Sequence, residues 1–231
     1  MQISWLTKFS LLDFPWKISC IVFTAGCNLR CPFCHNPELV FVEDTKNIIS
    51  EKDFFNFLES RKWFLDWVSI CWWEPTVQKD LLKFCEKIKK KWFLVKIDTN
   101  WSYPDVIKRL LDKRLVDYIA MDIKNPIEKL NDIVWVKIKI DNFIKSKDLL
   151  LKSKIDYEFR TTLIAWIHTT KDIKKMAKFI SWAKNYFLQN YKPWNTLKKD
   201  FKWKSFSRLE LEEFKEICKK YVKNIEIRNF L

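Results

Sequence analysis

The most informative stretch of this 231-residue chain reads ISCIVFTAGCNLRCPFC and spans residues 18–34. Its first part, Ile18 to Thr24, is rich in β-branched and aromatic residues, which favours a buried strand. Its second part carries three cysteines with the spacing Cys-x3-Cys-x2-Cys. The stretch therefore predicts a strand that delivers a cysteine-rich loop at its carboxyl end.

The three clustered cysteines are Cys27, Cys31 and Cys34. Three thiolates on one short loop can hold three irons of a cubane [4Fe–4S] cluster and leave the fourth iron open. Zinc is the alternative, but a structural zinc usually takes four protein ligands. The chain has two imidazoles, His35 and His168. A zinc site of three cysteines and His35 stays open as the less favoured reading.

Strand-like and helix-like segments alternate along the rest of the chain. Beyond Ile18–Thr24, strands are expected at residues 68–71, 94–98, 117–123, 157–163, 186–189 and 222–227. Helices are expected over 77–88 and after the capping residues Ser50, Ser102, Thr169 or Thr170, and Ser207. Such alternation indicates parallel βαβ units. We therefore expect an α/β fold, an open (partial) TIM-type (β/α)6 barrel, as one domain over residues 1–231 with a core of about 16–228.

Polar residues fall near the carboxyl ends of several predicted strands, where barrels of this type place their chemistry. They are Glu74, Asp98–Asn100, Asp122–Lys124 and Arg160. We expect them to gather around the cysteine loop.

Composition narrows the expected partners and the expected location of the protein. Lys and Arg total 43 and Asp and Glu total 29, which gives a formal charge of +14. The lysines are scattered and form no basic patch with interleaved aromatics, so we expect a solvated surface and no nucleic-acid partner. Apolar runs stay far below the roughly 20 residues of a membrane helix, and no signal-peptide layout opens the chain. A cytoplasmic location without membrane contact is expected. The four dispersed cysteines supply no second cluster motif.

The cysteine motif and its flanking residues resemble those of a known enzyme family. Cys-x3-Cys-x-Phe-Cys after a first strand resembles the radical S-adenosylmethionine (SAM) signature, and the flanks are similar to activating enzymes of glycyl-radical enzymes. The nearest resemblance is to activating proteins of anaerobic ribonucleoside-triphosphate reductases. The segments that carry it are Leu11–Pro15, Phe23–Cys27, Cys34–Leu39, Asp98–Asn100, Met121–Lys124, Tyr157–Thr162 and Leu188–Tyr191.

The resemblance implies a radical activase. SAM would bind the open iron, and one-electron reduction would yield methionine and a 5′-deoxyadenosyl radical that takes hydrogen from a glycine of the partner enzyme. A flavodoxin- or ferredoxin-type protein would supply the electron. The alternatives are activation of another glycyl-radical enzyme of the formate-lyase type, a radical SAM reaction on a small molecule, and a basic zinc-binding nucleic-acid module.

The resemblance also implies which residues contact SAM. Phe33 would lie near the adenine, and Glu74 would lie near the amine. The other implied positions are Trp72, Trp73, Asp98, Asn100, Asp122, Lys124 and Arg160. For the polar ones a monovalent-cation site, loop capping and ordinary salt bridges are the alternatives.

Glycine is almost missing from this chain. It has 1 Gly and 13 Trp, whereas average usage of about 7% predicts roughly 16 glycines. The family's Gly-Gly-Glu-Pro reads Trp72-Trp73-Glu74-Pro75 here, and its Asp-Thr-Asn-Gly ends in Trp101. We expect that UGA encodes glycine in the source organism and is read as tryptophan in this sequence. A divergent, genuinely Trp-rich protein is the alternative.

Overall fold

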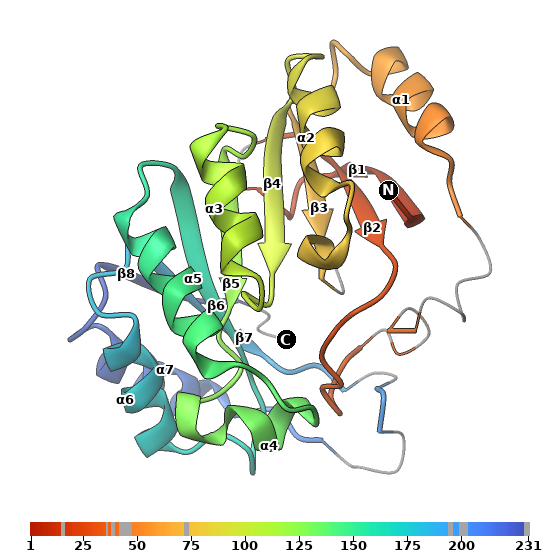
Figure 1. The fold of residues 1–231 in the computed structure, drawn as a ribbon. Coiled ribbons are helices and arrows are strands. Elements are labelled where there is room, and N and C mark those ends of the chain that lie inside the picture. Colours follow the sequence, from red (N-terminus) through yellow and green to blue (C-terminus); the bar gives the residue numbers. More distant parts are fainter. Residues whose placement is uncertain are drawn as a thin grey trace. The chain divides into compact units, whose positions relative to one another are not determined.

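A computed structural model describes residues 1–14, 17–35, 37, 40–41, 48–71, 74–193, 196–198 and 203–228. Helices alternate with strands along these residues (Figure 1). Contacts divide the chain into two compact units. The first comprises Met1–Asn28, Glu38–Ile119 and Ser153–Asp156, and the second comprises Leu29–Pro37, Ala120–Lys152 and Tyr157–Leu231.

The first unit is built on four neighbouring strands in chain order. They are β1 (Ile3–Ser10), β2 (Ser19–Thr24), β3 (Trp67–Cys71) and β4 (Leu94–Thr99). The strand β1 runs antiparallel to β2, whereas β2, β3 and β4 are parallel. Every residue of β2 and β3 is buried, as expected for parallel strands covered on both faces.

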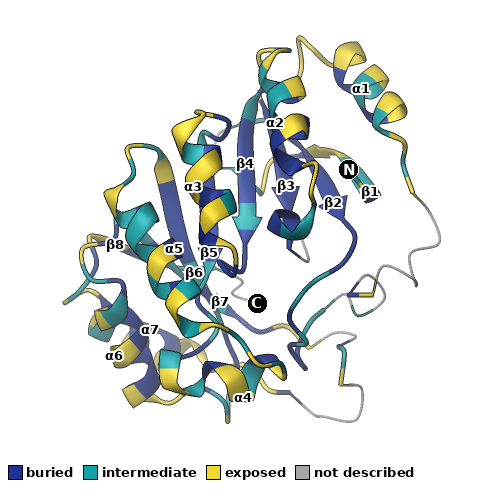
Figure 2. Ribbon diagram, in the orientation of Figure 1, coloured by how far each residue is buried: buried dark blue, intermediate teal, exposed yellow. Residues whose placement is uncertain are grey.

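The helices of the first unit are α1 (Glu51–Ser60), α2 (Leu81–Lys89) and α3 (Pro104–Asp112), with a 3₁₀ turn η3 at Pro75–Val77. The Ser50 hydroxyl accepts from the Asp53 backbone N–H at 3.1 Å and starts α1. Figure 2 shows the inner faces of α2 and α3 buried and their outer faces exposed, which is the amphipathic pattern of helices covering a sheet.

The second unit contains the end of β5 (Tyr118–Asp122), then β6 (Asp156–Leu163), β7 (Asn185–Asn190) and β8 (Asn224–Arg228). The strands β6, β7 and β8 are parallel. The helices are η4 (Ile127–Lys129), α4 (Leu130–Val134), α5 (Ile140–Lys152), α6 (Thr170–Phe179) and α7 (Arg208–Cys218). Both α6 and α7 begin with complete capping boxes, and the two helices pack on one another.

The expected α/β fold is confirmed, and so is each predicted strand within about two residues. The strands β1 and β8 are edge strands, so the sheet does not close into a barrel. One capping prediction is wrong: the N-cap of α3 is Tyr103, and Pro104 is the first residue of the helix. The Ser102 hydroxyl donates to the Asn100 side chain instead. No helix of the described residues is long and apolar enough to cross a membrane. A single domain over 1–231 stays a prediction.

Candidate functional site

The cysteine loop leaves β2 through a tight turn in the first unit. Gly26 has φ 85°, a left-handed conformation that a side chain disfavours. Its carbonyl accepts from the Glu74 N–H at 3.3 Å, and the Cys27 N–H donates to the Val40 carbonyl at 3.2 Å. These bonds hold Cys27 half-buried beside the segment that follows β3.

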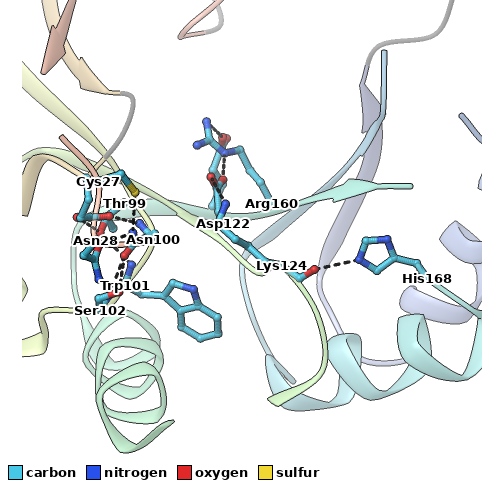
Figure 3. Close-up of polar contacts among 12 residues, drawn as sticks. Cys27, Asn28, Thr99, Asn100, Trp101, Ser102, Asp122, Lys124, Arg160 and His168 are labelled. Carbon is cyan, nitrogen blue, oxygen red and sulfur yellow. Dashed lines mark hydrogen bonds and ion pairs between the residues drawn. The ribbon is translucent and has the colours of Figure 1, made fainter. Parts of the chain in front are cut away.

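Asn100, directly after β4, connects this loop to the next turn (Figure 3). Its Oδ1 accepts from the backbone N–H of Ser102 at 3.1 Å and from the Ser102 hydroxyl at 2.6 Å. These two donors set the orientation of the amide, so Nδ2 faces the cysteine loop. Nδ2 lies 3.7 Å from the Cys27 Sγ and 2.9 Å from the Asn28 Oδ1. The amide is therefore an oriented N–H donor to the first cysteine.

Glu74 lies fully buried beside the same turn. Its Oε1 accepts from the Thr76 backbone N–H at 3.1 Å, from the Thr99 hydroxyl at 2.7 Å and from the Thr76 hydroxyl. Its Oε2 accepts from the Asn100 N–H. Burial nevertheless raises the pKa of this carboxyl. A cationic ligand group at Glu74 would favour the ionised carboxylate.

The other two cysteines belong to the second unit, where a turn brings them together. The Cys34 N–H donates to the Cys31 carbonyl at 3.0 Å, and the Cys34 carbonyl accepts from the Leu197 N–H at 3.1 Å. Burial raises the pKa of the Cys31 thiol to about 11, although the nearby Lys124 ammonium lowers it in part. Between them Phe33 is buried, with its ring edge-on to Trp203 at 6.2 Å.

A charged cluster lies on and just after the strands of the second unit, with members from β5, β6 and β8. Asp122, the last residue of β5, lies between two cations: Arg160 Nε at 2.9 Å and Lys124 Nζ at 3.6 Å. The neighbouring Glu158 forms a bidentate pair with Arg228, with both oxygens at 3.0 Å. Lys124 and Arg160 thus form the salt bridges that were the alternative to a cofactor contact.

His168 fixes the segment after β5. The Ile164 N–H donates to its Nδ1 at 3.1 Å, so the ring proton lies on Nε2, which donates to the Lys124 carbonyl at 2.9 Å (Figure 3). Burial lowers the pKa of His168 and keeps this ring neutral. The sequence offered no periodic or spacing signal for this role.

The remaining predicted positions have contacts of their own or lie outside the described residues. Asp98 pairs with the buried Lys96 at 3.1 Å. His35 Nε2 lies 3.1 Å from the Lys192 carbonyl, and its ring stacks on Tyr191. Trp72 and Trp73 lie outside the described residues.

None of the three loop cysteines, all of which the structure describes, forms a disulfide. Among the residues that the structure describes, no group of three or more His, Cys, Asp or Glu side chains forms a ready metal site. Cys27 belongs to the first unit, whereas Cys31 and Cys34 belong to the second. The donor chemistry, three thiols within eight residues, fits a cluster with three cysteine ligands, and this ligand set stays a prediction.

Comparison with known proteins identifies the family. Residues 21–182 match the sequence profile of the radical SAM superfamily. The chain belongs to this superfamily. Radical SAM enzymes use a [4Fe–4S] cluster and S-adenosylmethionine, so these are the cofactors of this enzyme.

Two relatives place this radical SAM enzyme among the glycyl-radical enzyme activating enzymes. A protein assigned to that activity in Methanocaldococcus jannaschii is 34% identical, over 98% of this chain and 95% of its own length. The pyruvate formate-lyase-activating enzyme of Clostridium pasteurianum is 25% identical, over 95% of this chain and 96% of its own length.

Solved structures agree on the fold of this radical SAM enzyme. Streptococcus suis SuiB bound to S-adenosylmethionine superposes with a TM-score of 0.68 and 18% identity, over 88% of this chain and 48% of SuiB. A domain of the pyruvate-formate lyase-activating enzyme from Bacteroides vulgatus gives a TM-score of 0.56 and 16% identity, over 70% of this chain and 98% of that domain. The expected partial barrel is thus the radical SAM core.

Proposed function

We propose that this enzyme generates a glycyl radical on an anaerobic ribonucleoside-triphosphate reductase. The observation that carries the proposal is the Cys-x3-Cys-x2-Cys loop after β2, whose first cysteine accepts an oriented N–H from Asn100 at the end of β4. Family membership supports glycyl-radical activation, and the motif resemblance across the chain supports the reductase as the partner.

In this proposal Cys27, Cys31 and Cys34 ligate the cluster. These three residues would hold the cluster, whose one-electron chemistry with bound SAM would provide the hydrogen-atom abstraction from the target glycine. Because burial raises the pKa of Cys31 to about 11, its thiol keeps its proton until a metal replaces it. Ligation at this position therefore releases a proton.

The protein's own groups would orient SAM. Glu74 is a buried carboxylate, which suits the cationic amine of the methionine end. Lys124 and Arg160 both already neutralise Asp122 and offer donors for the carboxylate of SAM. The other positions proposed to contact SAM or a monovalent cation are Phe33, Trp72, Trp73, Asp98, Asn100 and Asp122.

A second partner is favoured by one observation. The Clostridium pasteurianum relative is named for pyruvate formate-lyase, so activation of a formate-lyase-type enzyme is the competing proposal. A flavodoxin- or ferredoxin-type protein would supply the electron in either case.

The test is an anaerobic activation assay. The chain is made as written and with glycine at 72 and 73, reconstituted with iron and sulfide, and incubated with dithionite, SAM and each candidate partner. EPR should show a glycyl-radical doublet on the reductase, with stoichiometric 5′-deoxyadenosine. A doublet on the formate-lyase-type enzyme alone would shift the assignment to that partner, and a doublet on neither would reject activation.

A further inference from the structure

We propose that the functional chain carries glycine where this sequence reads tryptophan, through a UGA codon decoded as glycine. The backbone provides the observation. Among the described residues six non-glycine residues have positive φ, and five of them are tryptophan: Trp92 (71°), Trp101 (63°), Trp135 (52°), Trp166 (75°) and Trp182 (72°). The sixth is Arg114 (53°).

Tryptophan is an unexpected residue at such angles. Positive φ brings Cβ against the neighbouring carbonyl, and it is uncommon for bulky side chains. Nine of the thirteen tryptophans lie among the described residues, so more than half of these have the conformation that glycine alone adopts freely. Gly26, the one glycine of the chain, has the same sign of φ.

Their places in the fold also match glycine. Trp92 follows α2 and Trp182 follows α6, each just past the helix end, and Trp135 is the left-handed C-cap of α4. Helices commonly end on a left-handed glycine at this position. Trp101 and Trp166 lie in the turns after β4 and β6, where the chain reverses direction.

Four of the five left-handed tryptophans are exposed, and only Trp101 among them is fully buried. The side chains of Trp92 and Trp182 are 88% and 81% exposed, although tryptophan is on average a highly buried residue. Within β3, the indole nitrogen of Trp67 is buried without a hydrogen-bond partner among the described residues. Rings acquired by selection would be buried or bonded, and the exposure of Trp92 and Trp182 shows no such use; at these two turns the Trp-rich alternative lacks a physical reason.

The deciding experiment reads both the gene and the natural protein. The codons at 92, 101, 135, 166 and 182 are sequenced, and the chain purified from the organism that carries the gene is digested with trypsin. The peptide between Lys91 and Lys96 reports position 92. UGA codons together with the residue mass of glycine are expected. UGG codons, or the mass of tryptophan at any of the five positions, would overturn the proposal.

The hydrogen bond to Cys27 carries a second, independent inference, which rests on the proposed function. We infer that Asn100 is a positioning residue that raises the reduction potential of the cluster. Its Nδ2 lies 3.7 Å from the Cys27 Sγ, and the two Ser102 donors on Oδ1 prevent the amide from flipping. Reduction adds negative charge to the cluster and its sulfurs, and an N–H donor stabilises that charge.

The test is an EPR-monitored redox titration of the reconstituted enzyme. Asn100→Ala should shift the midpoint potential to a more negative value, and Asn100→Asp, which keeps the shape but brings an acceptor, should shift it further. Asn28→Ala is the matched control, because it removes the other partner of Nδ2 and leaves the bond to sulfur. An unchanged potential in both Asn100 variants, at full iron and sulfide content, would reject the inference. A parent enzyme that assembles no cluster would instead reject the proposed function.

Discussion

Two tryptophans with the same exposure separate the effect of backbone conformation from that of side-chain burial. Trp92 and Trp63 are both 88% exposed, but Trp92 alone of the two has a positive φ. Trp92→Gly should raise the free energy of unfolding by about 1 kcal/mol, because it relieves the left-handed strain. Trp63→Gly should leave it unchanged or lower it, because glycine then adds only chain entropy to the unfolded state.

Urea unfolding monitored by circular dichroism measures both changes. The difference between the two variants is the informative quantity, since loss of an exposed indole is common to them. Equal shifts for Trp92→Gly and Trp63→Gly would show that φ has no part in the effect.

The thiol of Cys31 provides a second residue-scale prediction. Because burial raises its pKa to about 11, little thiolate exists at pH 8. In the cluster-free chain we expect iodoacetamide to label Cys31 at least about 100-fold more slowly than in urea, where the pKa returns to about 8.5. Tandem mass spectrometry of the peptide that also contains Cys34 gives both rates. Equal labelling of Cys31 in the folded and unfolded chains would contradict the prediction.

At the scale of elements, His168 joins the turn after β6 to the segment after β5. Its neutral ring accepts from Ile164 and donates to Lys124, and burial lowers its pKa below the ordinary value of 6.5. The unfolded chain therefore binds a proton that the folded chain does not, at pH values between the lowered pKa and 6.5. The contribution of His168 to the free energy of unfolding should be fully present above pH 6.5 and should be lost as the pH decreases through that window.

His168→Gln should remove the part of the pH dependence that His168 contributes and cost about 1–3 kcal/mol at pH 7.5, since one of the two backbone groups loses its partner. Urea unfolding between pH 5 and 8 measures both effects. His35→Gln is the comparison, because burial lowers the pKa of His35 as well but its contacts are Lys192 and Tyr191, so this variant should lose only the part that His35 contributes. A pH profile of His168→Gln that parallels the parent would refute the assignment.

The same scale shows which elements were predictable. Ser50, Thr169 and Ser207 were expected to cap helices and do so, because a capping signal is local. Ser102 has the same local signal, but its hydroxyl bonds to Asn100, so a tertiary contact decides its role. The strand β1 was not predicted, because its residues Ile3–Ser10 do not alternate between buried and exposed and its pairing depends on β2.

For the whole molecule, the backbone strain of the five left-handed tryptophans is additive. At about 1 kcal/mol each, their strain is about 5 kcal/mol, a large part of the 5–15 kcal/mol by which domains are usually stable. Replacing the four that are not buried (Trp92, Trp135, Trp166 and Trp182) by glycine should therefore raise the urea midpoint far above that of the chain as written. Trp101 is left in place because its ring is fully buried and glycine would leave a cavity. An unchanged midpoint in this fourfold variant would mean that these turns tolerate tryptophan without strain.

Some features of the site were predictable from the sequence, and others were not. The spacing of Cys27, Cys31 and Cys34 indicated the cofactor chemistry, and the family assignment agrees with it. The bond from Asn100 to Cys27 and the carbonyl held by His168 join segments distant in sequence, and such contacts leave no pattern in a single chain. The excess of tryptophan over glycine was visible in the sequence alone. The positive φ angles then showed that several of these tryptophans occupy backbone conformations that favour glycine.

A tryptophan in the edge strand β1 decides in which hosts this gene could be expressed. The third residue of β1 is Trp5, the first tryptophan of the chain. If that codon is UGA, a ribosome with the standard code stops there, before any residue of the cysteine loop is made. The gene would then be silent in any ordinary host that acquired it, whether by transfer, by viral transduction or by cloning. The activity would stay confined to lineages that share the same decoding.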